Sequence, residues 1–356
     1  MRSQHLWGAP LRTAPEALGA MVAVQAQEYA YAKWSLAQRT RTVVDADVRD
    51  DYARGRILRT HLLRPTWHFV TPDDANWLLE LTAPRVQVVN GHHLRSLDLD
   101  EGTLARTGEL IAEAVEGGNH LTRRQIGAML QAAGVGADGM RLGYILMAAE
   151  LHRVVISGVP SGRQHTYAAF GERVPASEPL DRDAALARLA RRYFATRGPA
   201  TVRDLARWSG LTLADCRTGL DAVADEFRVA EVEGRSLWYP PRQDAAPRPP
   251  VVDLVQGYDE CIMSYSDTKD YLADPDLAGR GAPAHVHAVL VDGLVVGHWK
   301  HTLSARSATI DLALHRTLSA PETAALDAEI QRYGEFLELQ REKVSAHEHH
   351  QPKGNP

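Results

Sequence analysis

The fold of the first part of the chain is indicated most clearly by the stretch Leu58-Arg59-Thr60-His61-Leu62-Leu63-Arg64-Pro65-Thr66-Trp67-His68-Phe69-Val70. This stretch holds two short apolar runs, residues 57–63 and 66–70, which predict strands bent at Pro65. Three short helical patterns precede this hairpin, near residues 15–22, 29–38 and 45–55. Three helices followed by a hairpin are the pattern of a winged helix.

The same order of elements is repeated twice further along the chain. The second copy has helical patterns at 101–116, 122–126 onward and 140–151, then strands at 154–158 and 164–170. The third has helices capped by Asp181, Thr201 and Thr212, then a hairpin at 229–239. We therefore expect three tandem winged-helix (helix-turn-helix) units, which we call unit 1 (residues 1–90), unit 2 (91–175) and unit 3 (176–240).

The composition changes after unit 3. A proline-rich linker is predicted from Pro240 to Pro250, followed by strand patterns and a closing helix from Ser319 to about Glu338. We expect a β-rich domain over residues 251–340 and a disordered tail over 341–356. The predicted fold class is mainly α with β (α+β), with tandem winged-helix units followed by a β-rich C-terminal domain.

Two glutamines flank one alanine in Val24-Gln25-Ala26-Gln27-Glu28-Tyr29. Residues two apart point to nearly opposite sides of a helix, so these amides can line one pocket only if the backbone is extended or broken between them. A convergent pair of amides could hold a water, a sugar hydroxyl or a base edge without carrying charge. The alternative is that both are solvated glutamines at a helix end.

The run from Leu18 to Tyr29, together with the 58–70 stretch, resembles the winged-helix DNA glycosylases of the AlkZ/YcaQ type. The resemblance extends over roughly residues 10 to 340, through Arg163-Gln164-His165-Thr166-Tyr167, Gly257-Tyr258-Asp259-Glu260 and Gly297-His298-Trp299-Lys300. It implies tandem winged helices, a β-rich domain, and excision of alkylated bases, including crosslinked or bulky genotoxin adducts, in DNA repair and antibiotic self-resistance. Gln25 and Gln27 then match the catalytic Gln-x-Gln motif, and the carboxylate of the Gln-x-Asp members is lacking.

The chemistry of an alkylated purine explains how amides could suffice. A purine alkylated at N7 is already cationic, so it leaves without protonation, while the sugar develops oxocarbenium character. The protein must supply a positioned water and acceptor dipoles near the developing cation. Glutamine cannot act as a general base at neutral pH, so we expect a monofunctional hydrolase that is selective for cationic lesions and uses no cofactor and no metal.

The net charge of −5 does not favour nucleic acid, but only the charges at an interface release counterions. Arginines concentrate in two segments, residues 49–64 and 181–207. Their alternative role is to cover solvated helix faces. The residues predicted to contact DNA are Arg59, Arg64, Trp67, His68, Arg163, Gln164, Arg191, Arg192, Arg203 and Lys300.

Two other classes of function stay open: a winged-helix transcriptional regulator without catalysis, and a protein that sequesters a DNA-damaging drug. The adjacent carboxylates Asp259 and Glu260, near a strand end, are expected to be structural, with at most one reaching a pocket. Cys216 and Cys261 are expected to be buried thiols. No run reaches the length of a membrane span, and a cytoplasmic monomer that associates with the nucleoid when bound to double-stranded DNA is expected.

Overall fold

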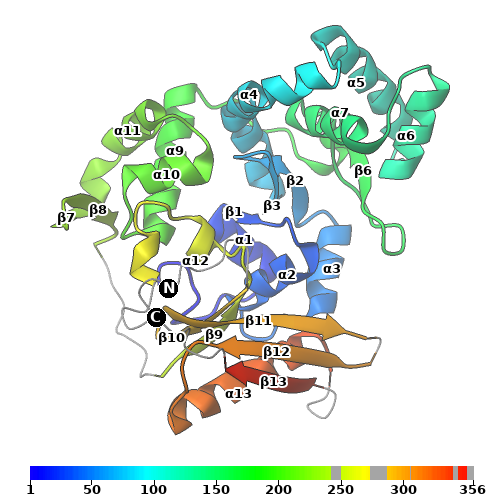
Figure 1. The fold of residues 1–356 in the computed structure, drawn as a ribbon. Helices are drawn as coiled ribbons and strands as arrows, with labels where there is room; N and C mark the ends of the chain where they lie inside the picture. The colour runs from blue at the N-terminus through cyan, green and yellow to red at the C-terminus, as the bar shows by residue number, and fades with distance from the viewer. Residues whose placement is uncertain (242–249, 273–286, 305, 340–343, 351–356) are drawn as a thin grey trace.

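The computed structural model describes residues 1–241, 250–272, 287–304, 306–339 and 344–350. Figure 1 shows unit 1 (blue) at the centre, units 2 and 3 (cyan to green) above it, and the C-terminal sheet (orange) below. Helices predominate, and the strands form one larger and several small sheets. The predicted α+β fold class is confirmed.

Unit 1 follows the winged-helix plan with one addition. A short strand lies between its first and second helices and pairs with the second strand of the hairpin, which gives the sheet order β1-β3-β2. The 57–63 and 66–70 strand predictions are confirmed within a residue or two. The elements are α1 (Ala14–Met21), β1 (Ala23–Gln25), α2 (Tyr29–Ala37), α3 (Asp45–Ala53), β2 (Leu58–Leu62) and β3 (Thr66–Val70).

Units 2 and 3 repeat this topology. Unit 2 has the sheet order β4-β6-β5, and in unit 3 the short strand is reduced to one bridge between Ala200 and Trp238. Unit 2 contains α5 (Glu101–Val115), β4 (Leu121–Thr122), α6 (Arg123–Ala132), α7 (Gly139–Leu151), β5 (Val155–Ser157), β6 (Thr166–Ala169) and α8 (Phe170–Arg173). Unit 3 contains α9 (Arg182–Arg197), α10 (Val202–Ser209), α11 (Leu213–Asp221), η1 (Ala224–Glu226), β7 (Arg228–Val232) and β8 (Arg235–Tyr239).

The hydrophobic cores join units 1 and 3. One cluster combines the unit 1 strands, the long helix α4 (Pro72–Ser96) and helices α9 to α11, and it also includes Leu151, Ile156, Phe170 and Val174 of unit 2. Unit 2 has a core of its own, built on α5, α6 and α7. Unit 1 and unit 3 are therefore held against each other by apolar burial, which fixes the first strand of unit 1 near helices of unit 3.

The C-terminal part forms a five-stranded sheet of order β13-β12-β11-β10-β9. Helix α13 covers it, and Trp34 of α2 packs into the same apolar cluster. The elements are β9 (Val252–Val255), α12 (Glu260–Met263), η2 (Lys269–Leu272), β10 (Ala288–Val291), β11 (Leu294–Leu303), β12 (Ala308–Leu314), α13 (Ala320–Phe336) and β13 (Val344–His350).

The tail differs from the expectation of disorder. Residues 344–350 form β13, which pairs in parallel with β12 along its whole length, because the edge of β12 offers unpaired backbone groups. Residues 351–356, and residues 242–249 of the predicted linker, lie outside the described part of the chain. Among the helices that the structure describes, none combines the length and apolarity needed to cross a membrane.

Candidate active site

The Gln-x-Gln motif lies on an interrupted backbone, as its spacing required. Helix α1 ends at Met21, β1 runs to Gln25, and α2 begins at Tyr29. Val22, between α1 and β1, has φ 68° and ψ −55°, a conformation that is costly for a β-branched residue. Gln25 is buried and Gln27 is exposed. The motif therefore extends from the protein interior to the surface within three residues.

Unit 1 differs from the other units at this point. In units 2 and 3, Thr122 and Thr201 directly cap the next helix, each with a reciprocal capping box. In unit 1 the strand ends at Gln25 and the cap position, Glu28, makes no side-chain capping bond. In unit 1, therefore, the residue at the cap position does not cap α2 with its side chain. Gln25 and Gln27 make other contacts.

Both amide carbonyls of the motif are bonded to the β2–β3 hairpin, one at its turn and one on β3. Arg64 Nη2 donates to Gln25 Oε1 at 2.7 Å, and the Trp67 backbone N–H donates to Gln27 Oε1 at 3.4 Å. Each carbonyl oxygen keeps a second lone pair. The structure therefore brings Gln25, Gln27, Arg64 and Trp67 together, as four of the sequence-predicted residues.

Trp67 is half-buried, and its neighbours fix its ring. The guanidinium carbon of Arg59 lies 4.2 Å from the Trp67 ring centroid, and the His61 ring centroid lies 4.6 Å away. Arg59 itself is buried and donates from Nε to the Ala26 carbonyl at 3.0 Å. Arg59 thus supports the backbone between the two glutamines, and it offers DNA little exposed surface.

His68 is the cross-strand neighbour of Gln25 and is fully buried. Its Nδ1 lies 3.0 Å from the Thr66 carbonyl, which can only accept, so Nδ1 carries the hydrogen and Nε2 the lone pair. No described residue bonds to that Nε2. Burial, and then the charge of Arg64, lower the pKa of His68 to about 3, so the ring is neutral at physiological pH.

The burial of neutral His68 should make stability depend on pH. The unfolded chain binds a proton at a pH below about 6.5 that the folded chain excludes until about pH 3, so stability should fall as the pH drops through this window. At pH 5 this one group should cost about 2 kcal/mol of unfolding free energy. Urea titrations at pH 7 and pH 5 should show a smaller loss for His68→Gln than for the parent, while His92→Gln, at an exposed site, should match the parent. Equal losses in all three proteins would show that His68 does not cause the effect.

The β5–β6 hairpin of unit 2, which is the wing of its winged helix, reaches toward the motif. His165 at its base lies edge-on to Tyr29, with ring centroids 4.7 Å apart, and its Nδ1 lies 3.5 Å from the Tyr52 hydroxyl. Arg163 and Gln164 at the tip of the wing are exposed. This arrangement places two predicted DNA contacts on a hairpin whose base packs beside the residue that begins α2.

Asp259 and Glu260 follow strand β9 and make structural ion pairs, as expected, but they lie on a helix and not on the strand. Asp259 caps the short helix α12 and Glu260 begins it, and both are fully buried. Asp259 pairs with Arg39 at 2.8 Å, and Glu260 pairs with Arg197 at 2.8 Å. Glu260 also accepts from the Gln25 backbone N–H at 2.9 Å, a contact that sequence analysis missed.

The remaining predicted residues lie apart from the motif. Arg191 forms an exposed pair with Glu226 at 2.7 Å, and Arg192 is bonded to Asp74 and to the Gly19 carbonyl. Arg203 is exposed and 4.0 Å from Asp267. Lys300, on the C-terminal sheet, lies 3.6 Å from Asp311. Arg192 therefore holds α9 to unit 1, so a substitution there would not probe DNA contact alone.

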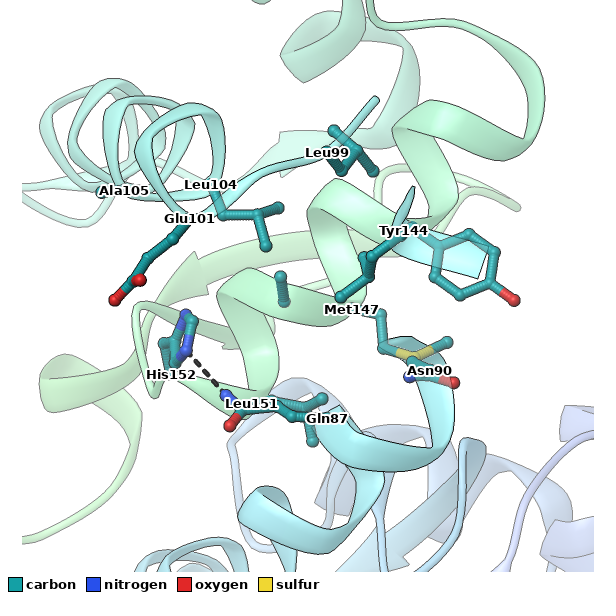
Figure 2. A pocket seen from close by; sticks show the side chains of 12 residues that line it. Gln87, Asn90, Leu99, Glu101, Leu104, Ala105, Tyr144, Met147, Leu151 and His152 are labelled. Atoms are coloured by element: carbon teal, nitrogen blue, oxygen red, sulfur yellow. Dashed lines mark hydrogen bonds between the residues drawn. The ribbon is translucent and has the colours of Figure 1, made fainter. Parts of the chain in front are cut away.

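A pocket of about 420 Å³ between α4 and unit 2 is separate from the motif. Figure 2 shows that it opens between α4, α5 and α7 and that Gln87 and His152 are bonded at its edge. Its walls are mainly leucine, alanine and methionine side chains. None of the glutamines and arginines around Gln25 lines it, so we take the motif as the candidate active site. In the described part of the chain, no three His, Cys, Asp or Glu side chains are grouped to bind a metal ion.

Comparison with known proteins identifies relatives along nearly the whole chain. Residues 18–336 match the family described as AlkZ-like DNA glycosylase. An interstrand DNA cross-link repair glycosylase from Streptomyces sahachiroi is 24% identical over 320 residues, which is 84% of this chain and 85% of that protein. The solved structure of the Streptomyces sahachiroi DNA glycosylase AlkZ superposes with a TM-score of 0.79 at 21% identity, covering 98% of this chain and 96% of that one.

Proposed function

The chain belongs to the AlkZ-like DNA glycosylase family, and on that premise we propose that it hydrolyses the N-glycosidic bond of N7-alkylated, cationic purines in double-stranded DNA. We extend the proposal to bulky or crosslinked genotoxin adducts, because a relative that aligns with 84% of the chain is a cross-link repair glycosylase. The reaction consumes one water, releases the modified base, leaves an abasic site and gives one proton to solvent. No cofactor takes part in it.

In the proposed mechanism, the amide carbonyls of Gln25 and Gln27 orient the attacking water. As the bond to the base breaks, the sugar becomes cationic, and the two carbonyl dipoles stabilise it electrostatically. The base leaves as a neutral molecule because its alkylation already supplied the positive charge. An unalkylated purine would have to be protonated, and neither glutamine can do that.

The observation that most supports this proposal is that both motif carbonyls are bonded to the same β2–β3 hairpin. Buried Gln25 is bonded to Arg64 in the turn, and exposed Gln27 to Trp67 on β3. Gln25 is thereby held in one orientation, while Gln27 is open to a ligand. A fixed acceptor next to an accessible one is suited to holding a water in one orientation. Two freely solvated glutamines at a helix end would have no such anchors.

Arg64 is the residue best placed to link the motif to DNA. It reaches Gln25 Oε1 with one nitrogen and the Arg207 carbonyl, in unit 3, with another at 3.3 Å. We propose that a phosphate beside the lesion binds this guanidinium, which would neutralise its charge before the sugar cation develops. Trp67, which is half-buried, is proposed to lie beside the damaged nucleotide. The predicted DNA contact at His68 is wrong, because its side chain is fully buried.

Arg163 and Arg203 are two exposed arginines among the predicted DNA contacts, and the pair of Arg203 with Asp267 is long, at 4.0 Å. We expect Arg163→Ala/Arg203→Ala to weaken binding of damaged and undamaged duplex equally, since phosphate contacts carry no lesion information. Each lost contact should reduce the slope of log affinity against log salt by about 0.9. Arg12→Ala, at a side chain that is 89% exposed, is the matched control. A double variant with the parent's slope would remove both residues from the interface.

An excision assay separates this function from the two alternatives. Duplex containing N7-methylguanine is incubated with the protein and then treated with alkali, which cleaves abasic sites. Strand breaks that require the protein indicate a glycosylase, whereas a mobility shift without breaks indicates a regulator. Protection that occurs only when protein is added before an alkylating drug indicates sequestration of the drug.

A further inference from the structure

Glu260 is a fully buried carboxylate that accepts four hydrogen bonds. Its Oε1 accepts from the Gln25 backbone N–H at 2.9 Å. Its Oε2 accepts from Arg197 Nη2 at 2.8 Å, Trp208 Nε1 at 2.7 Å and Ser264 Oγ at 2.8 Å. Arg197, Trp208 and Ser264 hold the carboxylate in place. The remaining donor, the Gln25 N–H, belongs to β1, the candidate catalytic strand.

Strand β1 is an edge strand, so half of its backbone groups point away from the hairpin. The N–H of Ala26 donates to Trp67 O at 2.7 Å, which makes the neighbouring pair, Gln25 with His68, a non-hydrogen-bonded one. The Gln25 N–H and C=O therefore point outward. Glu260 accepts from the N–H, and Gln256 Nε2 donates to the C=O at 3.4 Å. The side chains of Gln256 and Glu260 are thus hydrogen-bonded to both outward-pointing backbone groups of Gln25.

Arg197, the partner of Glu260, holds the start of the same strand. Its Nη2 donates to the carbonyls of Met21 at 2.9 Å and Ala23 at 3.2 Å. These carbonyls flank Val22, whose φ of 68° is unfavourable for a valine. A strained backbone persists only where its surroundings over-determine it, and here the buried guanidinium supplies the constraint.

We propose that Glu260, with Arg197, is a positioning residue for base excision: the ion pair fixes the backbone of β1 and thereby the direction of the Gln25 side chain. This inference rests on the proposed catalytic role of Gln25. A neutral acceptor could satisfy the Gln25 N–H equally well, so the hydrogen bond alone does not explain a buried charge. A charge-assisted bond in a water-excluded site is shorter and stronger, and a misplacement of about 1 Å at a reacting centre can cost about a hundredfold in rate.

Asp259 offers a matched control because it is the adjacent residue. It is equally buried and equally ion-paired, to Arg39, and its bonds hold α12 and α2 without touching Gln25. Glu260→Gln keeps the size of the side chain but turns an NH2 group toward one of its donors. We expect Glu260→Gln to lower the single-turnover excision rate at saturating enzyme by about ten- to a hundredfold, with the Kd for damaged duplex unchanged. Asp259→Asn should keep the parent's rate in protein that remains folded.

A double-mutant cycle separates positioning from general damage. If Glu260 acts through Gln25, Gln25→Ala/Glu260→Gln should be no slower than Gln25→Ala alone, because the target of the positioning is gone. Rate losses that multiply in the double variant, or equal losses of excision rate in Glu260→Gln and Asp259→Asn, would overturn the inference. If Glu260→Gln does not fold, Ser264→Ala removes one donor to Oε2 with little change in volume; a parental excision rate in Ser264→Ala would count against the inference and a reduced rate at unchanged Kd would support it. Should Gln25→Ala itself excise at the parent rate, the proposed function fails instead.

Discussion

Replacing either glutamine of the motif by alanine is expected to slow base excision at least about tenfold, the low end of what a positioned dipole contributes. Gln25→Ala removes the acceptor that Arg64 holds in place, and Gln27→Ala removes the exposed acceptor bonded to the Trp67 N–H. The loss should be confined to the chemical step, because neither side chain carries charge to attract phosphate. Single-turnover kinetics on N7-methylguanine duplex, with Kd measured separately, tests both variants.

Gln131→Ala is the control for these variants. Gln131 is an exposed glutamine on α6 of unit 2, so its removal should leave both rate and Kd at the parent values. Gln25→Ala and Gln27→Ala proteins that excise at the parental rate would refute the catalytic assignment, and a loss of DNA binding in either would assign the motif to recognition.

Replacing Arg39 is expected to cause a large loss of folding stability. Arg39 is fully buried, pairs with Asp259 through two bonds of 3.0 and 2.8 Å, and donates to the Gln4 and Ser35 carbonyls. Arg39→Met should lower the free energy of unfolding by about 3–5 kcal/mol, because it leaves the Asp259 carboxylate buried without its counter-charge. Equilibrium unfolding in urea measures this difference.

Arg54→Met provides the comparison. Arg54 pairs with Asp50 at 2.9 Å, but both side chains are largely exposed, so the expected change is below about 1 kcal/mol. A change of similar size in both variants would show that burial does not set the value of the Arg39 pair.

Local signals in the sequence predicted most of the secondary structure. The Thr201 and Thr212 caps, and the hairpin at Pro65, each depend on a few adjacent residues, and the structure contains all three. The short strand of each unit was not predicted. Ala23–Gln25 is only three residues long and buried throughout, so it shows no alternation of apolar and polar residues.

The candidate site was only partly predictable. The spacing of Gln25 and Gln27 indicated a broken helix, which the structure contains. The bond between Gln25 and Glu260 joins residues 235 positions apart, and no local pattern encodes it. The number of arginines available to bind DNA could not be predicted from the charge distribution along the sequence. Arg192 and Arg197 are bonded inside the protein to groups far away in the sequence.

The charge of the leaving base tests directly whether the two glutamines support excision of cationic purines. A duplex with one N7-methylguanine and a matched duplex with one O6-methylguanine, which is neutral, are incubated separately with excess protein. The free bases are identified by chromatography against standards, because the two methylguanines have the same mass. We expect 7-methylguanine to be released and O6-methylguanine to be retained, since the glutamines can stabilise the sugar cation but cannot protonate a base. Duplex binding without release of 7-methylguanine, or equal release of both bases, would contradict it.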